Sequence, residues 1–310
     1  MRSLLLSFLT LFLVCCTGVE IGKMSKEEYC QKTWKFDLEC ALNHTLSDEE
    51  VQKISELAEK LKGENCKQTA WNALKWVEEN LKYDYYKASL PPPTIITKGR
   101  EVTVLNPERI YQTPEETMML RKGICGDFAI LTTAILIRNG CNAYVLFVDF
   151  IDYEIDHLAS AVLLDKIYVL DQKLPPMDLG SYYNKWLREG KRIGGIVIYE
   201  RDKKLMSFNE SEIMAQNYKF TKRDLEELKN LLIEKLKREL AYGEFYYREK
   251  LIITMFFDGL ADYYTPMFSE EIAEMIKERL LEKIEKKWKG FSLELEVSWP
   301  DIVLKLSLTN

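Results

Sequence analysis

Histidine is almost absent from this chain, and the close ligand pairs of zinc sites are missing. Only His44 and His157 occur among its 310 residues. No two cysteines stand two residues apart, and the two histidines are far from each other, so the sequence lacks the usual zinc-ligand spacing. We therefore expect no metal site and no cofactor. The same scarcity leaves only two candidates for an imidazole base.

The chain also lacks a basic tail. Its 43 lysines and arginines are outnumbered by 49 aspartates and glutamates, which gives a net charge of −6. This balance does not favour a nucleic-acid partner. With 47% hydrophobic and 30% charged residues, the composition indicates a globular protein with a sizeable core.

No apolar run at the amino terminus is long enough to cross a bilayer comfortably. Residues 4–16 are apolar and follow a single positive charge, Arg2, which is typical of a signal-peptide core. Residues 13–16 resemble a lipoprotein cleavage box with Cys16 as the lipidated residue. An uncleaved anchor and an ordinary secretion signal remain alternatives. We expect an exported protein, either secreted or attached to the cell envelope through its N-terminus.

Export would allow the cysteines beyond the N-terminal segment to form disulfides. In an oxidising compartment four of them could form two disulfides, although their pairing cannot be deduced from the sequence. The alternative is four unpaired, mostly buried thiols. These cysteines are Cys30, Cys40, Cys66 and Cys141.

Cys125 lies where a catalytic nucleophile is expected. A glycine turn brings Cys125 to the start of the apolar run 128–137, which predicts a buried helix, and Gly140 fits the left-handed position after its end. Unpaired N–H groups and the positive end of the helix dipole favour the nucleophilic thiolate. Asp127 can cap the same turn. The alternative is a small structural cysteine in the core.

His157 is the better candidate for a base. It opens a predicted strand, after which the chain turns and returns to Asp171. Asp171 could accept a hydrogen bond from one imidazole nitrogen while the other faces Cys125. His44, in contrast, lies in a polar loop just before a helix cap, and we interpret it as a surface residue.

The alternation of side chains along a strand tests this assignment. Asp171 shares a face with His157 only if it pairs with an odd-numbered residue. A two-residue turn at 165–166 would pair Asp171 with Ser160, on the wrong face. We therefore predict a three-residue turn or a bulge, which places Asp171 near Ala159 or Ala161.

The order Cys125, His157, Asp171 resembles that of the transglutaminase-like cysteine superfamily, and prokaryotic transglutaminase-like proteins are the most similar group. The resemblance runs from about Gln68 to Gln172. The segments that carry it are Trp76-Val-Glu-Glu-Asn-Leu-Lys-Tyr-Asp84, Thr113-Pro-Glu-Glu-Thr117, Lys122-Gly-Ile-Cys-Gly-Asp-Phe-Ala129, Arg138-Asn-Gly-Cys-Asn-Ala143, His157 and Tyr168-Val-Leu-Asp171.

The resemblance implies an α+β, papain-like fold in which a buried helix carrying the cysteine packs on a small antiparallel sheet. It also implies a side-chain donor upstream of the cysteine that completes an oxyanion hole. By position, the candidates are Gln112, whose amide can donate, and Tyr111. Members commonly carry an aromatic residue after the histidine, where this chain has Leu158. This departure affects what the resemblance implies about substrate binding more than what it implies about the triad.

The function implied by the resemblance is thiol acyl transfer on an amide or peptide bond of a protein or peptide substrate. Water would then give hydrolysis, as in a cysteine peptidase, and a lysine amine would give a protein cross-link. We favour hydrolysis because it needs no second protein substrate. A catalytically silent binding domain and a structural envelope protein are the alternatives, and the sequence does not indicate an oligomeric state.

The remaining segments suggest appendages to this core. The irregular stretch 84–112 contains the run Pro91-Pro92-Pro93 and a short hairpin across Gly99, and a loop this long often covers a cleft. Strands at 193–199 and 204–208 are expected to extend the sheet. After residue 210 we expect a mainly helical extension, with helices at 222–241, 247–262 and 269–289 and a final β-hairpin. We predict four divisions. They are a signal peptide or a lipoprotein or membrane anchor at 1–18, an N-terminal helical segment at 19–66, the transglutaminase-like core at 67–210, and a helical C-terminal region ending in a β-hairpin at 211–310.

Overall fold

The computed structural model describes residues 24–151, 153, 156–243, 250–284 and 288–309. The predicted signal or anchor segment therefore lies outside the described residues. Among the residues that are described, none of the helices has the length and apolarity needed to cross a membrane.

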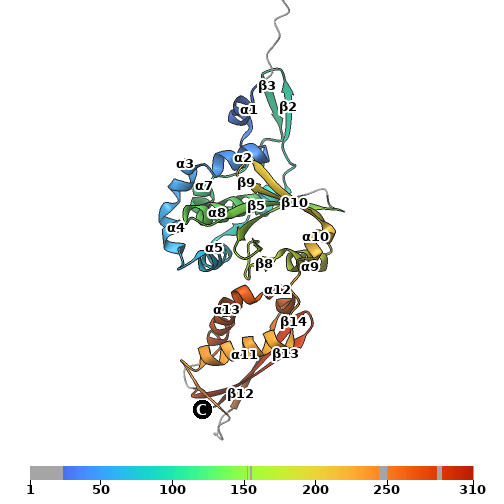
Figure 1. Cartoon of the computed structure of the whole chain (residues 1–310). Helices are drawn as coiled ribbons and strands as arrows, with labels where there is room; N and C mark the ends of the chain where they lie inside the picture. The colour runs from blue at the N-terminus through green and yellow to red at the C-terminus, as the bar shows by residue number, and fades with distance from the viewer. Residues whose placement is uncertain (1–23, 152, 154–155, 244–249, 285–287, 310) are drawn as a thin grey trace, which may run out of the picture.

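A six-stranded antiparallel sheet forms the centre of the molecule (Figure 1). Its strand order is β10-β9-β5-β6-β7-β8. The predicted hairpin after residue 192 does extend the sheet, because β9 pairs with β5. The strands are β5 (Ala143–Phe150), β6 (His157–Leu163), β7 (Ile167–Leu170), β8 (Met177–Asp178), β9 (Ile193–Glu200) and β10 (Lys203–Asn209).

Helix α8 (Cys125–Arg138) packs on this sheet and is buried from Cys125 to Leu136. Even-numbered residues of β6, such as Leu158, face the cluster around α8, whereas odd-numbered ones, such as Ala159, face the cluster around α9 (Leu179–Arg188). The α+β fold class, with a buried cysteine helix on a small antiparallel sheet, is therefore confirmed. Around α8 lie α3 (Asp48–Lys53), α4 (Ser55–Leu61), α5 (Cys66–Asn80) and α7 (Pro114–Leu120).

The N-terminal elements stand at one end of the central sheet (Figure 1). Helices α1 (Lys26–Thr33) and α2 (Leu38–Thr45) lie there, beside the hairpin of β2 (Thr94–Lys98) and β3 (Glu101–Leu105). The hairpin turns at Gly99, which has a positive φ of 64°, as expected. Small elements complete this part: β1 (Lys82–Tyr83), α6 (Tyr85–Ser89), β4 (Lys122–Gly123) and, next to α9, α10 (Glu210–Met214).

The C-terminal part, residues 221–309, has its own sheet covered by two helices. Helix α11 (Lys222–Leu236) begins after Thr221 with a capping box, and, as predicted, the last two strands form a hairpin. The sheet order is β11-β13-β14-β12. The elements are β11 (Ala241–Tyr242), β12 (Lys250–Phe257), α12 (Leu260–Tyr263), the 3₁₀ helix η1 (Pro266–Phe268), α13 (Ser269–Leu281), β13 (Gly290–Ser298) and β14 (Asp301–Thr309).

The helix expected over 247–262 is wrong, because residues 250–257 form the edge strand β12. The run Leu-Ile-Ile-Thr-Met-Phe-Phe is short and rich in β-branched and aromatic residues, which suits a strand. An apolar run of this length does not by its periodicity distinguish a strand from a buried helix. The C-terminal extension is therefore a mixed α and β structure rather than a mainly helical one.

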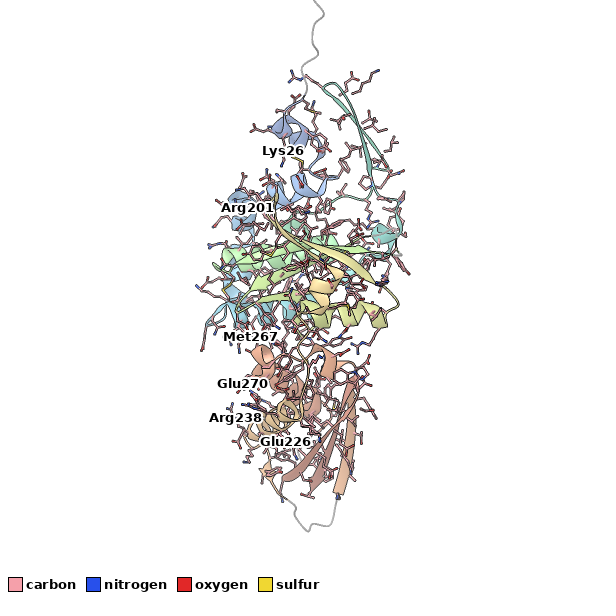
Figure 2. The ribbon with its side chains drawn as sticks, turned by 45° about the vertical axis from the view of Figure 1, so that its right-hand side comes forward. Lys26, Arg201, Glu226, Arg238, Met267 and Glu270 are labelled. Atoms are coloured by element: carbon pink, nitrogen blue, oxygen red, sulfur yellow. A yellow bond between two sulfur atoms is a disulfide. The ribbon has the colours of Figure 1, made fainter. Side chains whose placement is uncertain are left out.

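The C-terminal part packs against the core through Phe268. The Phe268 ring lies 6.1 Å from that of Trp71 on α5 and 5.3 Å from that of Tyr168 on β7. Ion pairs of 2.7 Å join Lys67 to Glu271 and Lys75 to Glu278 between α5 and α13. Figure 2 places Met267 and Glu270 where the two parts meet, and Lys26 and Arg201 toward the N-terminal end.

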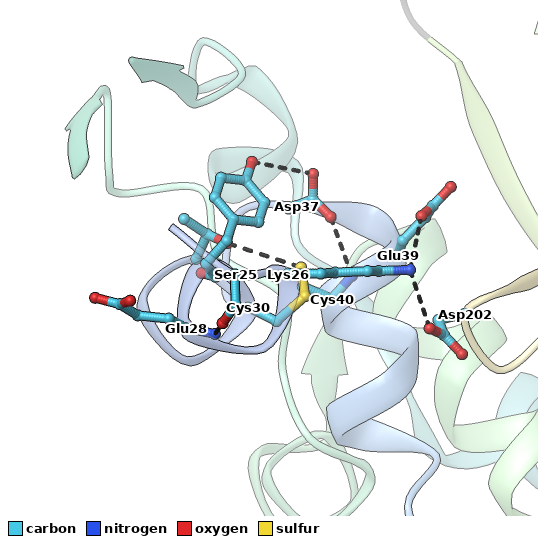
Figure 3. Close-up of a disulfide and its surroundings, with 10 residues drawn as sticks. Ser25, Lys26, Glu28, Cys30, Asp37, Glu39, Cys40 and Asp202 are labelled. Atoms are coloured by element: carbon cyan, nitrogen blue, oxygen red, sulfur yellow. Dashed lines mark hydrogen bonds and ion pairs between the residues drawn. A yellow bond between two sulfur atoms is a disulfide. The ribbon is translucent and has the colours of Figure 1, made fainter. Parts of the chain in front are cut away.

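Four cysteines form two disulfides, Cys30–Cys40 and Cys66–Cys141, and Cys125 remains a free, buried thiol. The possibility of two disulfides is thus confirmed, and the structure supplies the pairing. Cys30–Cys40 joins α1 to α2 (Figure 3). Cys66–Cys141 joins the start of α5 to the loop after α8.

Removing Cys66–Cys141 is expected to destabilise the protein more than removing Cys30–Cys40. The two bonds close loops with sequence separations of 75 and 10 residues. Loop-closure entropy gives losses of about 4.5 and about 3 kcal/mol, respectively. Urea unfolding of the two double cysteine-to-alanine variants measures the difference, and an equal or reversed order would contradict it.

Candidate active site

The turn before α8 holds Cys125 at the start of the helix. Strand β4 pairs in parallel with β1, so Gly123 lies beside Tyr83. A Cβ on Gly123 would come within 2.8 Å of the Asp127 Cβ and 2.9 Å of its Oδ2. Glycine is therefore required where the Asp127 carboxylate folds back under the turn.

Asp127 caps the helix, as predicted, and also joins two other segments to it. Its Oδ2 accepts from the backbone N–H of Ile124 at 2.8 Å and from Lys87 Nζ at 2.6 Å. Its Oδ1 accepts from the backbone N–H of Gln112 at 3.0 Å. Burial raises the pKa of Asp127, and the nearby Lys87 charge opposes that rise. This fully buried carboxylate thus fixes α6 and the segment before α7 relative to Cys125.

The predicted three-residue turn connects β6 to β7. Ser160 pairs with Leu170 and Leu163 pairs with Ile167, which leaves 164–166 as the turn. Continuing this register places Asp171 opposite Ala159, on the same face as His157. The condition set by strand parity is therefore met.

His157 and Asp171 form a buried pair. Nε2 of His157 lies 2.9 Å from Oδ1 of Asp171. The side chains of Tyr182 and Lys185 donate to the other oxygen, Oδ2, at 3.1 and 3.2 Å. Burial would raise the pKa of Asp171, but the charges of His157 and Lys185 outweigh it and lower that pKa below its ordinary value. The carboxylate is consequently charged and bound at both oxygens.

Cys125 and the same imidazole line one pocket. Because Nε2 of His157 faces Asp171, Nδ1 is the nitrogen left for the sulfur. Burial would raise the pKa of the Cys125 thiol, but the His157 imidazole, with the backbone N–H of Leu158, lowers it below its ordinary value. Burial would lower the pKa of His157, yet Asp171 and Cys125 raise it to about 10. Both shifts favour a thiolate beside an imidazolium.

Helix α9 supplies groups that the sequence did not reveal as part of the site. Tyr182, Lys185 and Trp186 are spaced i, i+3 and i+4, so they project from one face of the helix. The Trp186 ring packs edge-on against the imidazole with centroids 4.9 Å apart. These contacts extend the site beyond Asp171, the last of the candidate site residues. The amphipathic helical spacing was the only signal available.

The two oxyanion candidates lie in different places. Tyr111 lines a pocket beside Cys125. Gln112 lines neither of the two pockets at the sulfur, and its side-chain oxygen accepts from the Thr117 hydroxyl at 3.1 Å. The structure therefore brings Tyr111, rather than the favoured Gln112, to the thiol. His44 lies away from the site and stacks on Trp34.

Cys125 lies in the wall of two pockets. The first, here called the apolar pocket, has a volume of about 240 Å³, and the 84–112 segment forms part of its wall, as expected. Its apolar lining includes Phe36, Leu38, Pro92, Ile124, Phe147 and Leu158. The second, here called the polar pocket, measures about 510 Å³ and contains His157 and Asp171. Its charged lining includes Arg109, Asp156, Lys173, Lys185, Glu189 and Lys191.

A family model described as a transglutaminase-like domain matches residues 52–199. A UPF0252 protein of Archaeoglobus fulgidus is 44% identical over 97% of this chain and 98% of its own length. The chain belongs to the UPF0252 family. A second UPF0252 protein, from Pyrococcus furiosus, is 29% identical over 100% of this chain and 96% of its own length.

Among solved structures, calcium-bound LapG of Legionella pneumophila matches with a TM-score of 0.28 and 14% identity, over 50% of this chain and 90% of that one. In this UPF0252 protein the transglutaminase-like match includes Cys125, His157, Asp171 and α9. It excludes the C-terminal part.

Replacing Asp171 with asparagine is expected to lower the pKa of His157. The native pKa is about 10, so the imidazolium persists well above neutral pH. Without the carboxylate, burial dominates and the proton is lost at least about one pH unit lower. Because the chain has only two histidines, NMR titration of the imidazole protons resolves both, and a His44→Gln variant assigns them. An unchanged titration in Asp171→Asn would show that the pair does not control this proton.

Proposed function

We propose that this protein is a thiol acyl-transfer enzyme that hydrolyses amide or peptide bonds through Cys125, His157 and Asp171. The observation that carries the proposal is the buried His157–Asp171 hydrogen bond in the lining of a pocket that also contains the free thiol of Cys125. A nucleophile, a base and a group that orients the base are the three parts that such chemistry requires. The transglutaminase-like family match supports the same chemistry.

In the acylation step the Cys125 thiolate attacks the carbonyl carbon. The C–N bond breaks as the His157 imidazolium gives its proton to the leaving amine, which leaves a thioester and a neutral imidazole. Asp171 keeps Nε2 occupied, so that Nδ1 is the nitrogen that transfers the proton. In the deacylation step the neutral imidazole takes a proton from water, hydroxide attacks the thioester, and the acid leaves with regeneration of the thiolate–imidazolium pair.

The developing oxyanion requires donors near the sulfur. The backbone N–H of Cys125 belongs to the first helical turn, whose N–H groups have no partner within the helix. Tyr111 is the side-chain candidate in the same pocket. Burial raises the pKa of its phenol above the ordinary value, so the hydroxyl keeps the proton it would donate. Each such donor contributes about 3–4 kcal/mol in comparable enzymes.

Two alternatives share the same site. A lysine amine that entered in place of water would yield a cross-link, and a silent binding domain would retain the pockets without turnover. The lowered pKa of the Cys125 thiol favours turnover over binding alone, because a lowered thiol pKa serves reactivity rather than packing. Hydrolysis needs only water as the second reactant.

We also propose that the protein is exported and acts on proteins or peptides at the cell envelope. The support is the sequence of the N-terminal segment together with the two disulfides. Cell fractionation with intact-mass analysis of the mature chain tests this. A full-length chain that remains in the cytosol would refute it.

The wild-type protein is expected to cleave members of a defined synthetic peptide library in ¹⁸O-labelled water, with the label at each new carboxylate. Cys125→Ala should abolish cleavage, because no other free thiol occurs among the described residues. His157→Gln should slow it by at least about 100-fold. His44→Gln is the matched control and should retain full activity.

Mass spectrometry of the same library separates the three candidate functions. Labelled new termini support hydrolysis, peptide–peptide adducts that have lost ammonia indicate cross-linking, and intact peptides that are retained without turnover indicate a binding domain. Cleavage that persists in Cys125→Ala would exclude the proposed mechanism.

A further inference from the structure

The two pockets on either side of the sulfur differ in chemistry. The apolar pocket presents ring and aliphatic side chains from several separate segments, with Arg109 and Asp156 as its charged members. The polar pocket carries charges of both signs beside aromatic side chains such as Tyr85 and Trp186. A substrate that spans the sulfur therefore meets a mainly apolar pocket on one side and a charged pocket on the other.

The position of the imidazole decides which part of the substrate enters which pocket. His157 lines the polar pocket and is absent from the lining of the apolar pocket. Because the imidazolium protonates the leaving amine, that amine must lie on the imidazole side. The acyl part then extends to the other side of the sulfur.

We infer that the apolar pocket binds the side chain of the acyl residue, and that this residue is a large apolar one such as phenylalanine or leucine. This inference rests on the proposed function and deepens it by naming a substrate class. A cavity of about 150 Å³ is known to hold benzene. The apolar pocket, at about 240 Å³, has room for a phenylalanyl or leucyl side chain.

One wall of the apolar pocket is the loop closed by the Cys30–Cys40 disulfide. Phe36 and Leu38 lie between the two cysteines and both line the pocket. Figure 3 shows how this loop is held, with Asp37 accepting from the backbone of Cys40 and Lys26 paired with Glu39 and Asp202. These contacts make the wall a fixed part of the site.

The same loop is joined directly to the oxyanion candidate. The backbone N–H of Tyr111 donates to the backbone carbonyl of Lys35 at 2.8 Å. Gly126, next to Cys125, completes the pocket beside Tyr111, since a Cβ there would lie 3.1 Å from both the Tyr111 ring and the Leu158 side chain. The apolar pocket therefore begins immediately at the sulfur.

Acylation by two esters with the same leaving group tests the inference. We expect 4-nitrophenyl 3-phenylpropanoate, which carries the phenylalanyl side chain, to acylate Cys125 at least about tenfold faster than 4-nitrophenyl acetate. The reference is the ratio of the rate constants with which the two esters acylate glutathione, a thiol without a pocket. The expected size of the gain follows from the free energy of removing a phenyl ring from water. The burst of nitrophenolate gives both rate constants.

Phe36→Ala is expected to reduce the ratio at least about threefold, and Leu38→Ala provides a second variant of the same wall. The ratio does not depend on how much of a variant folds, because both esters meet the same molecules. Phe256→Ala is the matched control, since this side chain is 71% exposed on β12 and lines neither pocket. It should retain both rate constants.

The outcomes are distinguishable. If both esters give a burst, but the ratio of their acylation rate constants equals the ratio found with glutathione, the inference is overturned and the proposed function stands. A selective wild type whose ratio is unchanged in both Phe36→Ala and Leu38→Ala would also overturn it, because the ring would then bind elsewhere. The absence of a burst with either ester would overturn the proposed function itself.

Discussion

The hydrogen bond of 2.9 Å between His157 and Asp171 is the interaction on which the site depends. Both side chains are buried, and burial disfavours a lone charge on either of them. Asp171 remains ionised because His157, Tyr182 and Lys185 all contact its two oxygens. That charge raises the pKa of His157, and His157 in turn lowers the pKa of the Cys125 thiol. The proposed reactivity of the sulfur thus depends on a carboxylate from a different element.

The scaffold serves this interaction by fixing the ends of three elements together. Cys125 begins α8, His157 begins β6, and Asp171 follows β7, so each functional side chain lies where a regular element starts or stops. Asp127 fixes the helix end by joining Lys87 and the Gln112 backbone to it. A change of register in β6 and β7 by one residue would turn Asp171 to the opposite face.

The sequence was most informative where local chemistry decides the structure. The glycine turn before Cys125, the cap formed by Asp127 and the alternation of β6 residues all operate over a few residues, and the predictions based on them are met in the structure. The sequence was least informative where distant segments meet. The pairing of Cys66 with Cys141, the approach of α9 to Asp171 and the difference between Tyr111 and Gln112 all depend on tertiary packing. The apolar run of β12 was misassigned for a related reason: its periodicity does not distinguish a strand from a buried helix, and its pairing with β14 decides between them.

The most direct test of the central claim is the ultraviolet absorbance of the thiolate as a function of pH, taken as the difference between the wild type and Cys125→Ala. Disulfides contribute equally to both proteins, so the difference reports Cys125 alone. The account predicts a thiolate that is already present at neutral pH and is lost only when the solution is made acidic. A thiolate that forms only near the ordinary thiol pKa, about 8.5, would show that His157 and Asp171 do not act on the sulfur.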